Sequence, residues 1–187
     1  MSKAWLHIIG IGEDGLAGLG QTARAMIDNA AILVGGERHL AMLGDDPRPR
    51  LSWNIPLDRT FAKIRRHKGK PVCVLATGDP MSYGIGVSLI GEFGAAQCQV
   101  IPHQSAFSLA CARLGWPLAE VDCMTLHGRP LSLLNQHLRP NARLLILSAD
   151  GGTPKQVAKA LQAAGYGDSR ITVLEHMGGV KEKRHDG

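Results

Sequence analysis

The chain has 187 residues, of which 44% are hydrophobic, 20% are charged and 4% are aromatic, and its formal net charge is +5. This length suits one domain or two small lobes, and the composition is that of a folded globular protein rather than a disordered one. The low aromatic content disfavours a base-stacking nucleic-acid surface. The positive charge favours an anionic partner instead.

The chain has no apolar run near the ~20 residues that a membrane span needs. Its first apolar stretch is also too short for a signal-peptide core, so we expect a cytoplasmic protein that does not contact a membrane. The cysteines include no C-x-x-C pair, and the histidines form no H-E-x-x-H motif. We therefore expect reduced thiols and no metal site.

Short apolar runs alternate with amphipathic segments along the first half of the chain. The runs predict strands at 5–9, 32–34, 72–76 and 99–101, with a short edge strand near Trp53. The helical periodicity predicts helices at 21–29, 37–43, 57–64 and 82–92. The basic stretch 48–70 holds eight Lys and Arg residues against one acid, and it is read either as a solvated helix face or as an attraction for an anionic substrate.

The second half repeats this alternation. We expect strands at 122–126, 143–147 and 171–174 and helices at 105–114, 131–138 and 155–164. Strands separated by helices imply parallel pairing and an α/β architecture. A boundary near Pro102 divides the chain into lobes 1–101 and 102–187, and a cleft between lobes is a preferred place for a ligand.

The first glycine loop follows the first expected strand. The segment Gly10–Gly15 matches G-x-G-x-x-G, which on its own suggests an NAD(P)-dependent oxidoreductase. However, Gly18 and Gly20 continue the loop where the dinucleotide motif has a helix, and Glu13 and Asp14 would repel a pyrophosphate. A cationic or hydroxyl-bearing ligand fits the loop better, and a tight turn is the structural alternative.

Three further loops follow expected strands. In Thr77–Pro80, Asp79 offers a fixed acceptor at a strand's carboxyl end, although Gly-Asp-Pro is also ordinary turn chemistry. Ser105 is either a ligand contact or a helix cap, and His103 is either a titrating ligand residue or a surface histidine. After a later strand, Arg129 is either a carboxylate anchor or a solvated loop residue.

In this order, the glycine loop, Gly-Asp-Pro and Pro-x-x-Ser-Ala resemble the tetrapyrrole (corrin/porphyrin) methylases, which use S-adenosylmethionine. The segments 34–40, 127–129 and 175–179 are similar to the precorrin-6Y C5,15-methyltransferase branch of cobalamin biosynthesis. The resemblance implies a homodimer of two-lobed α/β subunits, with a mostly parallel sheet in each lobe and the methyl donor in the inter-lobe cleft. In that family one or more closing strands normally follow, whereas only 13 residues follow Leu174 here, so the resemblance implies a chain that is truncated at its C-terminal end.

The resemblance also implies site residues. Those implied to bind the donor are Gly12, Glu13, Thr77, Gly78, Asp79, Ser82, Ser105, Ala106, Ala149, Asp150 and Gly178. Those implied to bind the anionic precorrin are His103, His127 and Arg129. No catalytic base is identified, although His103 and Asp79 are candidates.

The implied reaction is methylation of a precorrin at C5, of precorrin-6B or a cobalt-precorrin-7 equivalent. A separate or fused domain would handle C15 methylation and decarboxylation. The alternatives are a methylase of the same fold acting on ribosomal RNA or a diphthamide precursor, the NAD(P)-dependent oxidoreductase, and a non-catalytic partner subunit.

Overall fold

The structure, a computed structural model, describes residues 4–187. These residues form two units: unit 1 ends at Ser105, and unit 2 spans Ala106–Gly187. The boundary expected near Pro102 lies in the last loop of unit 1. Within the described residues, no helix has the length and apolar character that crossing a membrane requires.

Unit 1 is built on one five-stranded sheet. The strands are β1 (Leu6–Ile11), β2 (Ile32–Gly35), β3 (Arg50–Ser52), β4 (Val72–Thr77) and β5 (Cys98–Ile101). The helices are α1 (Gln21–Asp28), α2 (Glu37–Ala41), α3 (Asp58–Arg65) and α4 (Ile85–Phe93), with short 3₁₀ helices at Gly15–Gly18 and Ala95–Gln97. The strand order is β3-β2-β4-β1-β5, and every neighbouring pair is parallel, which confirms the predicted α/β class.

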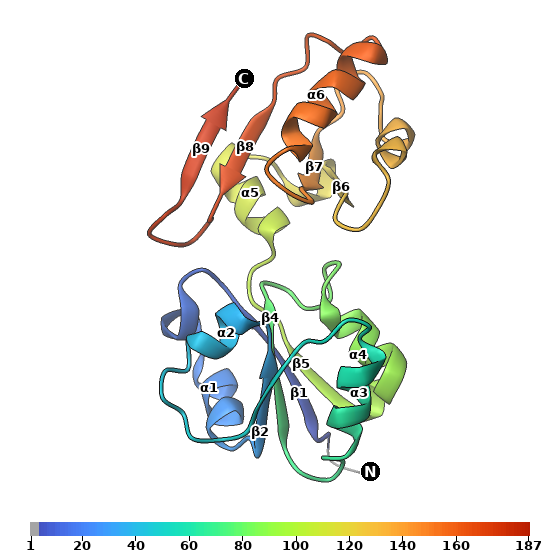
Figure 1. Cartoon of the computed structure of the whole chain (residues 1–187). Coiled ribbons are helices and arrows are strands. Elements are labelled where there is room, and N and C mark those ends of the chain that lie inside the picture. The colour runs from blue at the N-terminus through green and yellow to red at the C-terminus, as the bar shows by residue number, and fades with distance from the viewer. Residues whose placement is uncertain (1–3) are drawn as a thin grey trace. The chain divides into compact units, whose positions relative to one another are not determined.

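The helices of unit 1 cover both faces of this sheet (Figure 1). In β1, Leu6 and Ile8 pack with the core that includes α3 and α4, whereas Ile9 and Ile11 pack with the core that includes α1 and α2. Because successive strand residues point to opposite faces, a strand buried on both sides reads as a continuous apolar run. This is why the apolar run in the sequence predicted β1 correctly.

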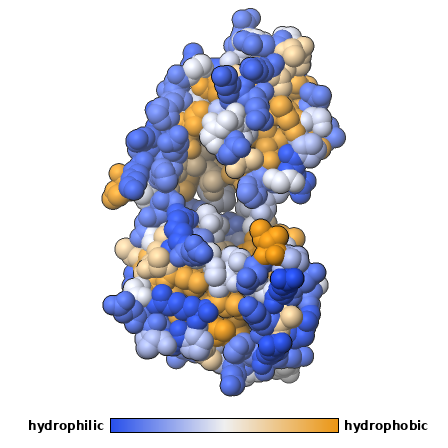
Figure 2. Space-filling model, viewed as in Figure 1, coloured by the Kyte–Doolittle hydropathy of each residue, from blue (hydrophilic) through white to orange (hydrophobic). Residues whose placement is uncertain are grey.

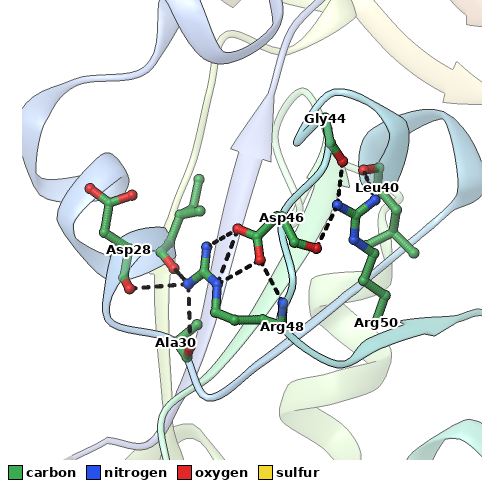
Figure 3. A network of polar contacts seen from close by, with 8 residues as sticks. Asp28, Ala30, Leu40, Gly44, Asp46, Arg48 and Arg50 are labelled. Atoms are coloured by element: carbon green, nitrogen blue, oxygen red, sulfur yellow. Dashed lines mark hydrogen bonds and ion pairs between the residues drawn. The ribbon is translucent and has the colours of Figure 1, made fainter.

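Arg48 connects the Pro- and Arg-rich segment before β3 to the end of α1 (Figure 3). Its guanidinium donates hydrogen bonds to the carbonyls of Ile27, Asp28 (3.1 Å) and Ala30 (3.2 Å). It also bonds the Asp46 carboxylate, and these hydrogen bonds lower the pKa of Asp46 to about 2. Since the last carbonyls of a helix lack partners within the helix, a cation there satisfies them and complements the helix dipole.

Arg50 donates hydrogen bonds to backbone carbonyls at the end of α2 in the same way (Figure 3). It donates to the carbonyls of Leu40 (3.2 Å), Gly44 and Asp46 (3.0 Å). Further along the basic stretch, Arg65 pairs with Glu92. These three arginines of the stretch 48–70 are therefore held by partners within unit 1.

Unit 2 contains two separate two-stranded sheets. Its strands are β6 (Asp122–Thr125), β7 (Leu144–Leu147), β8 (Thr172–Glu175) and β9 (Lys183–Asp186). Its helices are α5 (Ala106–Leu114) and α6 (Thr153–Ala163), with 3₁₀ helices at Leu118–Glu120 and Leu131–Gln136. The β6–β7 pair is parallel, and the β8–β9 pair is an antiparallel hairpin (Figure 1).

A cavity of about 370 Å³ lies within unit 2. Residues of α5, β7, α6 and β8 line it, and most of these are aliphatic or aromatic. Figure 2 shows apolar side chains reaching the surface of this unit, whereas β9 is exposed and hydrophilic. Of the residues predicted to bind ligands, only Ala106 lines the cavity.

Most expected elements lie within a few residues of their observed positions, with two differences. The segment expected as a helix at 131–138 is a 3₁₀ helix at Leu131–Gln136, and its Leu134 is fully buried. The strand β9, which pairs with β8, was not predicted, because its residues Lys, Arg, His and Asp show no apolar pattern.

We expect Arg48→Ala to lower the free energy of unfolding by about 1–3 kcal/mol, because several carbonyls and Asp46 lose a charged donor. Lys63→Ala, on the exposed side of α3, is the matched control and should change stability little. Urea unfolding followed by circular dichroism measures both. Equal stability of the two variants would show that the Arg48 contacts contribute nothing.

Candidate functional site

The polar loops of unit 1 meet at one edge of its sheet. The neighbours β2, β4, β1 and β5 are parallel, so their carboxyl ends lie side by side, and each is followed by a loop. The chain leaves β1 toward α1 and leaves β4 toward α4, helices that cover opposite faces of the sheet. In open α/β sheets, ligands bind outside the carboxyl ends of strands whose following helices cover opposite faces in this way.

The end of β1 and the loops after β4 and β5 are in backbone contact. Gly78 donates its N–H to the Ile11 carbonyl (2.9 Å), and the Gly78 carbonyl accepts the N–H of His103 (3.2 Å). A Cβ on Gly10 would lie 1.9 Å from that carbonyl oxygen, so only glycine fits there. Gly78 itself has φ +55°, a conformation that glycine adopts without steric cost.

One oxygen of the Asp79 carboxylate accepts a hydrogen bond within the Gly-Asp-Pro turn. Asp79 is half-buried, and its Oδ1 accepts the backbone N–H of Met81 (2.8 Å), while its carbonyl accepts the N–H of Ser82 (3.0 Å). Across residues 4–187, no partner of the other carboxylate oxygen is found. Asp79 is therefore fixed by the turn and retains an acceptor for a ligand.

Asp14 and His103 bring the loops after β1 and β5 together. The Asp14 Oδ2 lies 3.5 Å from the His103 Nε2, and 17% of the His103 side chain is exposed. A Cβ on Gly12 would lie 2.7 Å from the His103 Cε1, so the missing side chain of Gly12 makes room for this imidazole. The buried His103 Nδ1 has no hydrogen-bond partner within the described part of the chain.

Arg24 holds the rest of the glycine loop in place from α1. Its Nε donates to the Leu19 carbonyl (3.0 Å), and its Nη2 donates to the Leu16 carbonyl (2.5 Å). The loop 12–20 therefore has a defined shape, even though it contains four glycines.

Arg38 and His39 belong to the same edge, and sequence analysis did not select them as site residues. Arg38 forms an ion pair with Glu13, and His39 Nε2 lies 3.3 Å from the Thr77 hydroxyl. His39 is only 7% exposed, and burial, followed by the Arg38 charge, lowers the pKa of its imidazole. The sequence indicated these residues only through the segment 34–40, which was quoted for the family resemblance. Their place beside the other site residues depends on β2 lying beside β4.

In unit 2, the predicted residues follow β6, β7 and β8. His127 and Arg129 are exposed in the loop after β6. Ala149 and Asp150 follow β7, which is parallel to β6, so both loops lie at one edge of that sheet. The Asp150 Oδ1 accepts the N–H of Thr153 (3.0 Å) and so caps the start of α6.

Gly178 lies in the turn between β8 and β9. Its N–H donates to the Glu182 carboxylate (2.7 Å), which also pairs with Arg113 of α5. The Arg113 hydrogen bond, together with that from Gly178, lowers the pKa of Glu182 to about 2.

The structure thus gathers the predicted residues of unit 1 at one sheet edge. They are Gly12, Glu13, Thr77, Gly78, Asp79, Ser82, His103 and Ser105. The residues of unit 2, which begins with Ala106, lie at the positions given above within that unit. In the described chain, no group of three or more His, Cys, Asp or Glu side chains is arranged to hold a metal ion.

We expect Gly10→Ala to lower the free energy of unfolding by about 1–3 kcal/mol or more, since its Cβ would press on the Gly78 carbonyl. Gly20→Ala is the matched control in the same region, because a Cβ there meets nothing within 4 Å. Urea unfolding compares the two. A Gly10→Ala variant as stable as Gly20→Ala would contradict the close contact between the loops.

The lowered pKa of His39 predicts a pH-dependent stability. As pH falls below the ordinary histidine pKa of 6.5, the unfolded chain binds a proton at His39 while the folded protein still resists it. The contribution of His39 is therefore complete above about pH 6.5 and declines below it. We expect His39→Gln to lose less unfolding free energy than the unmodified protein between about pH 7.5 and 5.5, measured by urea unfolding. Parallel decreases in both proteins would argue against this effect.

Known proteins share both sequence and fold with this chain. A sequence profile of the tetrapyrrole (corrin/porphyrin) methylases matches residues 5–187. The precorrin-6Y C(5,15)-methyltransferase (decarboxylating) of a Sinorhizobium species is 44% identical over 180 residues, covering 96% of this chain and 44% of that protein. The cobalt-precorrin-7 C(5)-methyltransferase of Salmonella typhimurium is 29% identical over 180 residues, covering 96% of this chain and 89% of that protein. The chain therefore spans less than half the length of the decarboxylating relative.

Solved structures agree with this grouping. The precorrin-6Y methylase of cobalamin biosynthesis from Archaeoglobus fulgidus has a TM-score of 0.72 at 28% identity, covering 97% of this chain and 88% of that one. A uroporphyrin-III C-methyltransferase from Thermus thermophilus, solved with S-adenosylhomocysteine, has a TM-score of 0.72 at 20% identity, covering 97% and 82%. Because the profile matches nearly the whole chain, this protein belongs to the tetrapyrrole methylase family.

Proposed function

We propose that this chain binds S-adenosylmethionine and directs its methyl group to C5 of a precorrin macrocycle. The choice of C5 as the methylated position rests on two relatives that match the same residues of this chain. The same residues match less than half of a C(5,15)-methyltransferase and 89% of a C(5)-methyltransferase. Methylation at C5 is the step that the two names share.

The loops at the edge of the unit 1 sheet suit a cationic nucleoside. S-Adenosylmethionine supplies an activated methyl group on a positively charged sulfur. Among its other groups, the ammonium and the ribose hydroxyls are hydrogen-bond donors. Asp79 retains a carboxylate oxygen for such donors, Thr77 is exposed beside it, and Gly78 and Gly12 allow the backbone to approach closely.

A nicotinamide dinucleotide fits this edge less well. A pyrophosphate needs a helix N-terminus directly at the glycine loop, whereas α1 begins only at Gln21. The residues between Gly12 and α1 include Asp14, whose carboxylate opposes a phosphate. These features favour the methyl donor over the oxidoreductase alternative.

The main task of the protein in this reaction is alignment. Methyl transfer to carbon is an in-line displacement, and holding both reactants in line can supply ~7–11 kcal/mol of the barrier in favourable cases. In our proposal, the unit 1 loops hold the donor together with Ser105, Ala106, Ala149, Asp150 and Gly178. The side chains of His103, His127 and Arg129 bind the carboxylates of the anionic macrocycle.

The proposal also includes the oligomeric state of the protein and a second domain. We infer a homodimer, as in the two-lobed methylases that the sequence resembles, and a separate or fused domain for C15 methylation and decarboxylation. The full name of the Sinorhizobium relative covers both steps, and this chain matches only 44% of that protein. A chain that methylates at C5 alone would leave the second step to that other domain.

We expect the protein to bind S-adenosylhomocysteine and not NADH in parallel calorimetric titrations. Asp79→Asn should weaken S-adenosylhomocysteine binding roughly tenfold, the effect of losing a charged hydrogen-bond acceptor. Asn retains the Oδ1 acceptor for Met81, so the turn is preserved. Asp45→Asn, on the exposed connector, is the control and should bind like the unmodified protein.

The substrate needs its own assay. With precorrin-6B and S-adenosylmethionine, we expect the product to gain one methyl group at C5, detected by mass spectrometry and NMR. Binding of NADH without S-adenosylhomocysteine would overturn the proposed function. Methylation of ribosomal RNA in place of the macrocycle would overturn the substrate assignment.

A further inference from the structure

Two residues that follow β2 connect the loops expected to hold the methyl donor. Arg38 Nη1 pairs with the Glu13 carboxylate in the loop after β1, and Arg38 Nη2 lies 3.3 Å from His39 Nε2. The same Nε2 lies 3.3 Å from the Thr77 hydroxyl at the end of β4. A chain of polar contacts therefore runs from Glu13 through Arg38 and His39 to Thr77.

The donors and acceptors in this chain follow from the chemistry of arginine. A guanidinium has only N–H donors, so its contact with His39 requires an unprotonated Nε2. His39 is buried, and a positive charge on its ring beside Arg38 would be unfavourable. The imidazole is therefore neutral, with its proton on Nδ1.

The state of His39 determines the direction of the Thr77 hydroxyl. An unprotonated Nε2 can only accept, so the Thr77 hydroxyl at 3.3 Å directs its single proton to the Nε2 lone pair, which it shares with Arg38 in a three-centre contact. The two lone pairs of the Thr77 oxygen then remain as acceptors. Since Thr77 is exposed at the carboxyl end of β4, these acceptors are available to a ligand that donates hydrogen bonds.

We propose that His39 is a positioning residue of the donor site, which orients the Thr77 hydroxyl as an acceptor for a hydroxyl or ammonium group of the methyl donor. Arg38 links this orientation to the Glu13 carboxylate, so one residue pair sets the polarity of two adjacent loops. This inference rests on the proposed binding of S-adenosylmethionine. It concerns recognition of the donor and assigns His39 no contact with it.

Calorimetric titration of S-adenosylhomocysteine into His39 and Thr77 variants tests the inference. We expect His39→Met, which fills the buried site without an acceptor, to raise the dissociation constant roughly three- to tenfold. Thr77→Val should have an effect of similar size. The double variant should bind about as well as Thr77→Val alone, because His39 acts only through that hydroxyl.

The conservative variant His39→Gln distinguishes a positioning role of His39 from a purely structural one. In His39→Gln, the amide oxygen can accept from both Arg38 and Thr77, so affinity should return to within about twofold of the unmodified protein. His39→Asn is too short to reach Thr77 and should bind weakly, as His39→Met does. It also replaces His39→Met in the double-variant comparison if the methionine variant fails to fold.

The outcomes distinguish the two proposals. If the unmodified protein does not bind S-adenosylhomocysteine, the proposed function is wrong. If it binds, but His39→Met and His39→Asn bind equally well, His39 does not position the site. If the losses of affinity caused by the His39 and Thr77 substitutions add in the double variant, the inference is also wrong. The same holds if His39→Gln folds but does not restore affinity.

Discussion

The arrangement of unit 1 depends on a close backbone contact that leaves no room for a side chain. The backbone of Gly10, near the end of β1, lies so close to the Gly78 carbonyl that a Cβ would approach it to 1.9 Å. The same carbonyl accepts the N–H of His103, so the end of β1 and the loops after β4 and β5 meet there. Moving any of these loops would separate Asp79, His103 and the glycine loop, and the site we propose would lose its shape.

The chain's arginines show why net charge is a poor guide to a binding surface. The excess of +5 suggested an anionic partner, yet Arg24, Arg48 and Arg50 donate to backbone carbonyls at loop and helix ends. Arg38 and Arg113 pair with carboxylates. A charge that already satisfies a helix end or a carboxylate contributes to stability and is not free to bind a substrate.

The sequence predicted the elements that bury apolar side chains and missed those that do not. The strand β1 was predicted because both of its faces are buried, whereas the exposed residues of β9 have no such pattern. The leucines at 131 and 134 fit either an α-helix or a 3₁₀ helix, and burial of Leu134 alone does not distinguish them. The loop residues that follow the strands could be identified one by one as candidate site residues. The pairs Arg38–Glu13, His39–Thr77 and His103–Asp14 depend on the order of strands in the sheet, which local periodicity does not contain.

The proposed reaction also constrains where negative charge belongs in the site. Methyl transfer converts a sulfonium cation into a neutral thioether, so a carboxylate facing the sulfur would stabilise the reactant more than the transition state and slow the transfer. A carboxylate that accepts from a ribose hydroxyl or an ammonium group binds the donor before and after transfer with little such penalty. Pairing Glu13 with Arg38 neutralises one of the charges at this edge. Thr77, oriented by the neutral His39, provides an acceptor that carries no net charge. In the proposed site, this network would bind the nucleoside without stabilising the sulfonium that must react.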